Sequence, residues 1–315
     1  MIDRRQIEGA VAAVAGPRAT VRVEGDRVGV VVDATGLDPQ ARDALEASVR
    51  AAASVPGAEV RVVMTAERAT RRLIAVASGK GGVGKSTVAA NLAIALSRMG
   101  RRTGLVDADI YGPSQPRLMS AEGERPTARD GKLDPVPTPY GVPMLSMGQL
   151  VEPGRAIAWR GPMTAGALGQ LVDADWGATD TLVVDLPPGT GDVQLTMIQK
   201  HRPAGAVIVS TPQDLALIDA TRAIDLFAKA GVPVIGLVEN MSGYACPHCG
   251  EVSDPFGRGG AEAEAQRLGL PFLGRVPLLI AIRTASDAGR PPASDPADPV
   301  FAPIAEHVAA WLADH

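Results

Sequence analysis

The chain has 315 residues, with 31 Lys and Arg against 35 Asp and Glu and only two cysteines. This length allows one large domain, or a large and a small one. The near-balanced charge gives no reason to expect nucleic acid as a partner, and so few cysteines exclude a disulfide-stapled secreted scaffold. No apolar run reaches the roughly 18 residues of a membrane span, and the acidic residues near the N-terminus do not fit the n-region of a signal peptide. We therefore expect a cytoplasmic protein that binds neither nucleic acid nor membranes.

Residues 1–66 predict a small α+β module. Apolar residues recur at helical spacing in two segments, and three others alternate between apolar and polar residues as strands do. The polar stretch that follows predicts a linker at residues 67–72. The predicted elements are, in order, helix 3–14, strands 19–24 and 27–33, helix 38–53 and strand 58–64.

Residues 73–315 predict a second, larger domain of the α/β class. Short buried apolar runs alternate with helical segments, which is typical of a mostly parallel sheet covered by helices on both faces. The Pro- and Gly-rich interval 120–143 predicts a long loop, and residues 299–315 predict a terminal helix with an apolar face. The predicted strands are 73–77, 103–106, 143–146, 181–184, 206–209, 232–238 and 271–276.

A glycine-rich segment follows the first of these strands and precedes a helix. It reads Ser-Gly-Lys-Gly-Gly-Val-Gly-Lys-Ser-Thr and satisfies the phosphate-loop pattern G-x-x-x-x-G-K-[ST]. Glycines let backbone N–H groups turn toward phosphate oxygens, and the helix N-terminus adds its positive dipole end. We expect Lys85 to reach the terminal phosphates and Ser86 to ligate Mg²⁺. The predicted nucleotide-binding residues are Gly79, Lys80, Gly81, Gly82, Val83, Gly84, Lys85, Ser86 and Thr87.

Acidic residues follow two of the predicted strands, where open α/β sheets bind their ligands. Asp185 follows strand 181–184 and has the placement of a Walker B aspartate, which holds Mg²⁺ through water. Asp107 and Asp109 follow strand 103–106, while Asp192 is predicted to cap a helix over residues 193–200. None of the five lysines follows an asparagine, so the Asn-Lys-x-Asp segment that reads guanine is missing. This favours adenine, and hence ATP.

Cys246 and Cys249 form the single Cys-x-x-Cys motif of the chain. A redox pair would need the first cysteine at a helix N-terminus, whereas residues 250–257 predict a loop. A complete metal site within one chain would need about four ligands, and the histidines elsewhere lack ligand spacing. Two inert thiols are a third reading. The fourth is a half-site, in which two chains supply four thiolates to Zn²⁺ or to an iron–sulfur cluster and thus form a homodimer.

The phosphate loop resembles the deviant Walker A motif of the MinD, ParA and nitrogenase-iron-protein class of ATPases. The resemblance lies in the second lysine, Lys80, and implies that Lys80 crosses a homodimer interface to the nucleotide of the other subunit. Composition supports a specific role, because two of only five lysines stand in this loop and an ammonium fits among phosphates better than a guanidinium. The resemblance also implies that Asp109 orients the attacking water with Asp107 in support, and that Asn240 contacts adenine. Lys80, Lys85 and Asp109 are thus the predicted catalytic residues.

A wider set of motifs over residues 71–295 resembles the Mrp-type iron–sulfur cluster carrier ATPases. The resemblance implies a slowly hydrolysing homodimer that holds a [4Fe–4S] cluster between Cys246 and Cys249 of two subunits. Its partners would be an iron–sulfur scaffold and apo-acceptor proteins. The module at residues 1–66 resembles the accessory domain of that family but lacks cysteine. The motifs are the phosphate loop, Asp-Ala-Asp-Ile-Tyr-Gly-Pro-Ser, Trp159-Arg160-Gly161-Pro162-Met163, Asp185-Leu186-Pro187-Pro188-Gly189-Thr190-Gly191-Asp192, and Asn240-Met241-Ser242 before the cysteines.

Two other functions remain as hypotheses. A MinD/ParA-type positioning ATPase would bind membrane or DNA, but the predicted terminal helix has no Lys or Arg for a lipid surface and the arginines elsewhere are scattered. An ATPase with a structural zinc at its dimer interface would use the same two cysteines without carrying a cluster. No physical role is assigned to Trp159-Arg160-Gly161-Pro162.

Overall fold

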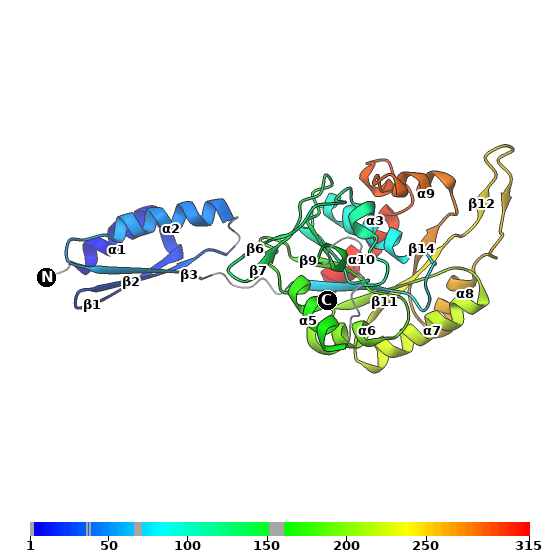
Figure 1. Ribbon diagram of the computed structural model, residues 1–315, viewed down its shortest axis with the longest axis horizontal. Coiled ribbons are helices and arrows are strands. Elements are labelled where there is room, and N and C mark those ends of the chain that lie inside the picture. Colours follow the sequence, from blue (N-terminus) through cyan, green and yellow to red (C-terminus); the bar gives the residue numbers. More distant parts are fainter. Residues whose placement is uncertain (1–2, 36, 38, 66–70, 151–160) are drawn as a thin grey trace. The chain divides into compact units, whose positions relative to one another are not determined.

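The computed structural model describes residues 3–35, 37, 39–65, 71–150 and 161–315. The chain separates into two compact units, Met1–Arg71 and Arg72–His315 (Figure 1). Most of the predicted linker lies outside the described residues, but Arg72, its last predicted residue, begins a strand of the second unit. Trp159 and Arg160 also lie outside the described residues.

The first unit is a three-stranded sheet with two helices on one face. Strand β1 pairs antiparallel with β2, and β2 pairs parallel with β3. Alternate β2 residues are buried beneath the helices, whereas Val31 and Val63 are exposed on the opposite face. Both helices lie on the same side of the sheet (Figure 1). The elements follow the predicted order: α1 (Arg4–Ala15), a 3₁₀ turn (Gly16–Arg18), β1 (Ala19–Glu24), β2 (Arg27–Asp33), α2 (Pro39–Ala53) and β3 (Glu59–Thr65).

The second unit contains a seven-stranded sheet of order β14-β11-β10-β4-β9-β5-β8 in which every pairing is parallel. This confirms the predicted α/β fold. Strand β4 stands in the middle, between β10 and β9, so the loop that follows it opens at a switch point of the sheet. The strands are β4 (Arg72–Ala77), β5 (Thr103–Asp107), β8 (Met144–Ser146), β9 (Thr181–Asp185), β10 (Gly205–Ser210), β11 (Val234–Asn240) and β14 (Phe272–Val276), each within two residues of its prediction.

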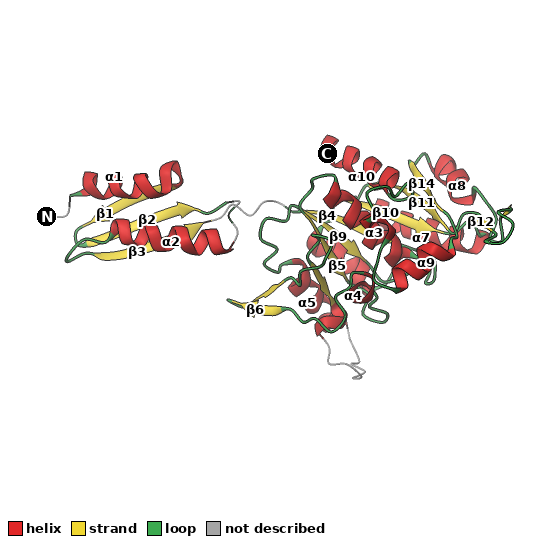
Figure 2. Cartoon of the chain, turned by 90° about the horizontal axis from the view of Figure 1, so that it is seen from above, coloured by secondary structure: helices red, strands yellow, loops and turns green. Residues whose placement is uncertain are grey.

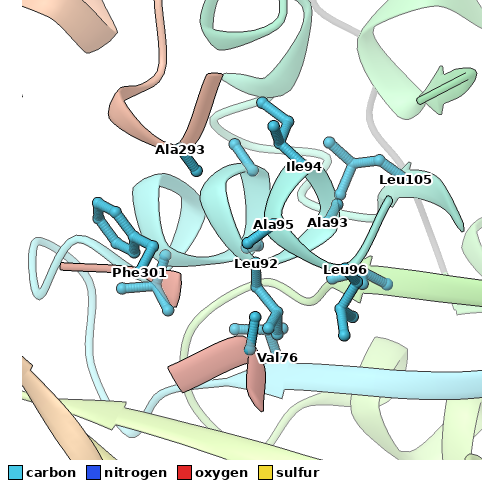
Figure 3. Close-up of a cluster of buried hydrophobic side chains, with 14 of the residues drawn as sticks. Val76, Leu92, Ala93, Ile94, Ala95, Leu96, Leu105, Ala293 and Phe301 are labelled. Carbon is cyan, nitrogen blue, oxygen red and sulfur yellow. The ribbon is translucent and has the colours of Figure 1, made fainter. Parts of the chain in front are cut away.

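Helices cover both faces of this sheet, which explains why residues 73–77 of β4 are all apolar. Ile74 and Val76 face one core, with α3 and α10, while Ala75 and Ala77 face the other, with α5, α6 and α7. Figure 3 shows Val76 among the α3 side chains, including Leu92, and Figure 2 shows the helices around the strands. The helices are α3 (Lys85–Arg98), α4 (Gln115–Leu118), α5 (Gly161–Val172), α6 (Asp192–Thr196), α7 (Asp214–Lys229), α8 (Gly260–Leu268), α9 (Ile280–Asp287) and α10 (Ala302–Asp314).

Three local predictions are corrected. The interval predicted as a loop contains an antiparallel hairpin of β6 (Thr127–Arg129) and β7 (Lys132–Asp134). Asp130 and Gly131 both have positive φ at its tip, as two-residue hairpin turns require. Asp192 is the first residue of α6 rather than its cap, and a π-helical turn, Met197–His201, follows α6. Finally, α10 begins at Ala302, later than predicted, and just before it the Asp298 carboxylate accepts a hydrogen bond from Phe301 N at 2.9 Å.

Candidate functional site

The phosphate loop connects β4 to α3, as its sequence predicts. Gly82 and Gly84 have φ values of 80° and 79°, a left-handed conformation that residues with a Cβ rarely adopt. Gly84 is immediately followed by the first helical residue, Lys85. The loop amides therefore stand at the positive end of a helix of 14 residues, which is the geometry of an anion site.

Gly79 shows how closely this loop packs on its surroundings. A Cβ at Gly79 would lie 2.0 Å from the backbone carbonyl carbon of Asp219 in α7 and 2.5 Å from Ala220 N. At Gly81 the nearest heavy atom, Cγ of Pro188, would be 3.8 Å away. The first glycine of the motif is thus required by the backbone of α7, in addition to any bound phosphate.

Gly79→Ala is expected to lower the free energy of unfolding by about 2–3 kcal/mol, because the new methyl group overlaps backbone that cannot rotate away. Gly81→Ala is the matched control and should unfold at nearly the wild-type denaturant concentration. Chemical denaturation followed by circular dichroism measures both. Equal midpoints for Gly79→Ala and the wild type would contradict the packing described here.

Lys85, Ser86 and Asp185 come together at the end of the loop. Lys85 is only 5% exposed, and its Nζ forms an ion pair with Oδ1 of the fully buried Asp185, 100 residues further along the chain. The same Nζ lies 3.4 Å from Ser86 Oγ. A hydroxyl and a carboxylate oxygen thus contact one ammonium group, and oxygen donors of this kind suit Mg²⁺. The phosphate and metal roles of these three residues remain predictions.

Gln115 belongs to this cluster although the sequence does not mark it. Its side-chain Nε2 donates to Asp185 Oδ2 at 2.8 Å and to the Ser86 carbonyl oxygen at 3.0 Å. Its buried Oε1 accepts no hydrogen bond from the described residues. An uncharged residue in the first turn of a short helix carries no sequence signal for a metal or phosphate site. The one feature of the sequence that could point to Gln115 is its position directly after Ser114, the last residue of the acidic motif.

Asp107 lies beside Asp185 on the neighbouring strand and is completely buried. Its carboxylate accepts hydrogen bonds from Gln115 N at 3.1 Å, Ser146 Oγ at 3.0 Å and Asp109 N at 3.1 Å. Burial, and then the charge of Asp185, raise the pKa of Asp107 to about 8. These contacts hold the start of the acidic loop, and the supporting role of Asp107 at the nucleotide remains a prediction.

The raised pKa of Asp107 predicts a pH dependence in nucleotide-free protein. Asp107 keeps its proton in the folded state up to about pH 8 but loses it above about pH 4 once unfolded, so this group makes stability fall between these values by at most about 1.4 kcal/mol per pH unit. The charged group that faces Asp107 is Asp185, and Lys85 lies on the other side of the Asp185 carboxylate as its ion-pair partner. Denaturant unfolding of the wild type and of Asp107→Asn across this pH range measures the effect. The wild type should lose stability relative to the variant as pH rises, and the opposite trend would contradict the assignment.

Asp109 and Lys80 lie near this centre but outside its buried contacts. Oδ1 of Asp109 accepts hydrogen bonds from Tyr111 N and Gly112 N, each at 3.2 Å, and so stabilises the turn after β5. Lys80 is half-buried, and no ion pair of its ammonium occurs within the described ranges. The roles predicted for these two residues, orienting water and crossing to a partner subunit, remain predictions.

Asn240 is the last residue of β11 and contacts the phosphate loop directly. Its Nδ2 donates to the Val83 carbonyl oxygen at 2.7 Å, and its Oδ1 accepts from Met241 N at 2.9 Å. The residue is 7% exposed. The structure thus places Asn240 at the loop itself, while the predicted adenine contact remains a prediction.

The cysteines lie at the tip of a hairpin rather than in a continuous loop, which corrects the prediction for residues 250–257. Strand β12 (Tyr244–Ala245) pairs antiparallel with β13 (Val252–Ser253), and the pair projects from the body of the second unit (Figure 1). Gly250 N donates to the Cys246 carbonyl oxygen at 2.9 Å, and Gly250 has a φ of 74°. Neither cysteine begins a helix, so the dipole on which a thioredoxin-like pair depends is missing.

Both thiols are free, with Cys246 partly exposed and Cys249 exposed. Hydrogen bonds to the Cys246 sulfur, first from the backbone N–H of Cys249 and then from that of His248, lower the pKa of this thiol. They favour the thiolate, the form that binds metals. Among the residues that the structure describes, no group of three or more His, Cys, Asp or Glu side chains could hold a metal ion. The hairpin therefore offers two ligands, half of the four that tetrahedral metal sites and iron–sulfur clusters use.

A family model of the NUBPL iron-transfer P-loop NTPases matches residues 69–312. The chain belongs to this family. The iron-sulfur cluster carrier protein of Pseudomonas fragi is 51% identical over 233 residues, covering 73% of this chain and 81% of that protein. The protein of the same name from Deinococcus radiodurans is 45% identical over 304 residues, 92% of this chain and 81% of that one, so its match extends into the first unit.

Solved structures agree with the family assignment. The nucleotide-binding protein of Archaeoglobus fulgidus in complex with ADP shares 39% identity and a TM-score of 0.63, covering 73% of this chain and 90% of its own. The family match confirms the predicted P-loop ATPase class and the resemblance to cluster carriers. No helix in the described ranges is long and apolar enough to cross a bilayer.

Proposed function

We propose that this protein is a homodimeric, slowly hydrolysing ATPase that carries an iron–sulfur cluster and transfers it to apo-proteins in the cytoplasm. One observation carries the proposal: two free, at least partly exposed cysteines form the tip of a hairpin, and the first of them lies six residues after the phosphate-loop contact Asn240, in a chain of the iron-transfer NTPase family.

The hairpin suits a cluster as cargo. A [4Fe–4S] cluster takes four thiolates, and two subunits related by a twofold axis would supply Cys246 and Cys249 twice. The amide hydrogen bonds to the Cys246 sulfur favour the thiolate. Exposure of the tip leaves room for an iron–sulfur scaffold to load the cluster and for an acceptor protein to remove it.

The phosphate loop suits ATP. Lys85 would bind the terminal phosphates, and Lys80 would reach the nucleotide of the partner subunit. Ser86 and Asp185 would hold Mg²⁺, which stabilises negative charge on the phosphates during transfer to water. Lys85 is paired with Asp185 in the structure, and its ammonium has three N–H donors, so further donors are available for a phosphate. Asp109 would orient the attacking water, and Asn240 would contact adenine.

Anaerobic reconstitution with iron and sulfide tests the proposal. We expect a brown chromophore and a dimeric mass by light scattering. Iron and sulfide analysis should give about four of each per dimer, the content of one [4Fe–4S] cluster. Protein without a chromophore, or protein purified anaerobically with stoichiometric zinc in place of iron, would show instead that the cysteines are structural. ATP-dependent pelleting with anionic vesicles, or retardation of DNA, would support the positioning ATPase.

A further inference from the structure

The peptide group between Val83 and Gly84 links the phosphate loop to the strand that leads to the cysteines. Its carbonyl oxygen accepts a hydrogen bond from Asn240 Nδ2 at 2.7 Å, across 157 residues of sequence. Its N–H belongs to the stretch of loop amides that the motif directs toward phosphate. Because a peptide group is planar and rigid, a change at the Gly84 N–H also moves the oxygen that Asn240 binds.

The contact between this loop and Asn240 has little space to absorb such a change. A Cβ on Gly84 would lie 2.1 Å from Asn240 Nδ2 and 3.9 Å from Met241 Cε. The amide of Asn240 therefore packs directly against the backbone of the loop. A displacement of the loop must displace Asn240 as well, since packed interiors transmit strain.

Asn240 in turn holds the bend that leads into the cysteine hairpin. Its Oδ1 accepts from Met241 N at 2.9 Å, and Met241 has a φ of 59°, unusual for a residue with a side chain. On the far side of the bend, Ser242 N donates to the Val276 carbonyl oxygen at 3.0 Å and Ser242 Oγ donates to Glu239 Oε1 at 2.7 Å. The bend thus has one attachment at the phosphate loop and another at the sheet.

We propose that Asn240 is the positioning residue through which bound nucleotide changes how tightly the hairpin holds its cluster. The inference rests on the proposed function. A phosphate on the Gly84 N–H polarises the peptide and strengthens its carbonyl as an acceptor, which draws Asn240 toward the loop. The Met241 bend follows, and with it the strand β12 that ends next to Cys246. By linkage, the cluster changes nucleotide affinity by the same factor.

The ratio of two ADP dissociation constants tests this coupling. Anaerobic calorimetry measures ADP binding to metal-free, reduced protein and to cluster-loaded protein. In the wild type the two constants should differ at least about fivefold. In Asn240→Ala the ratio should fall to about one, whatever happens to each constant separately.

Asn91→Ala is the matched control. Asn91 is the only other asparagine in the chain, and it is buried on α3, the helix that follows the phosphate loop. It donates to the Thr87 carbonyl oxygen at 2.8 Å and accepts from Ala293 N at 2.8 Å, and neither of these partners belongs to the hairpin. The same truncation at Asn91 should preserve the wild-type ratio.

The outcomes separate the inference from the proposed function. An adenine contact or a merely structural role of Asn240 would change both dissociation constants alike and leave their ratio unaltered. An unaltered ratio in Asn240→Ala, or a ratio of one in cluster-loaded wild type, therefore overturns the inference alone. Failure of the wild type to take up a cluster overturns the proposed function, and the inference with it.

Discussion

Replacing Lys85 with alanine is expected to lower ADP affinity at least about 100-fold, because the ammonium is the main positive charge that the loop offers to phosphate. The same change leaves the buried Asp185 without its ion-pair partner and next to Asp107. Removing one partner of a buried pair costs about 3–5 kcal/mol, so the variant should also unfold at a lower denaturant concentration. Calorimetry with ADP and chemical denaturation measure the two effects.

The double variant Lys85→Ala/Asp185→Asn separates binding from stability. It removes both charges of the pair, so most of the lost stability should return while ADP binding stays weak. Lys80→Ala is the control within the same loop, because within the described ranges its ammonium makes no ion pair and its removal should leave stability nearly unchanged. Wild-type ADP affinity in Lys85→Ala, or no recovery of stability in the double variant, would contradict the arrangement described here.

Replacing both cysteines with serine is expected to abolish cluster uptake. Serine keeps the size of the side chain and the backbone hydrogen bonds of the hairpin, such as that from Cys246 N to the Glu251 carbonyl oxygen at 2.9 Å. It removes the thiolates that iron requires. After anaerobic reconstitution, the variant should show no visible chromophore and only background iron and sulfide, while ADP binding to the cluster-free protein stays at the wild-type level.

His248→Ala distinguishes a thiolate cluster from mixed ligation. His248 stands between the two cysteines and is exposed, so its imidazole could replace a thiolate ligand in a Rieske-like arrangement. If four cysteines hold the cluster, this variant should load the wild-type amount of iron. Loss of iron in His248→Ala, or a chromophore that persists without the cysteines, would require a different ligand set.

Local patterns in the sequence predicted much of the fold. Most of the parallel strands, such as β5, β9 and β10, are buried on both faces, so their apolar runs are visible in the sequence whichever helices pack against them. The hairpin β6–β7 was missed because its strands are short and largely exposed, and only the Asp130-Gly131 turn marks it. The hairpin of Cys246 was missed for the same reason, since β12 and β13 have two residues each.

The sequence by itself determined the phosphate loop, the Cys-x-x-Cys motif and the family resemblance, because each depends on residues that are neighbours along the chain. Only the tertiary structure decided which distant groups meet. Lys85 reaches Asp185 because β4 and β9 are adjacent strands, and Gln115 joins them from α4. Asn240 reaches Val83 across 157 residues. Strand order and register bring these side chains together, and neither can be derived from the spacing of these residues along the sequence.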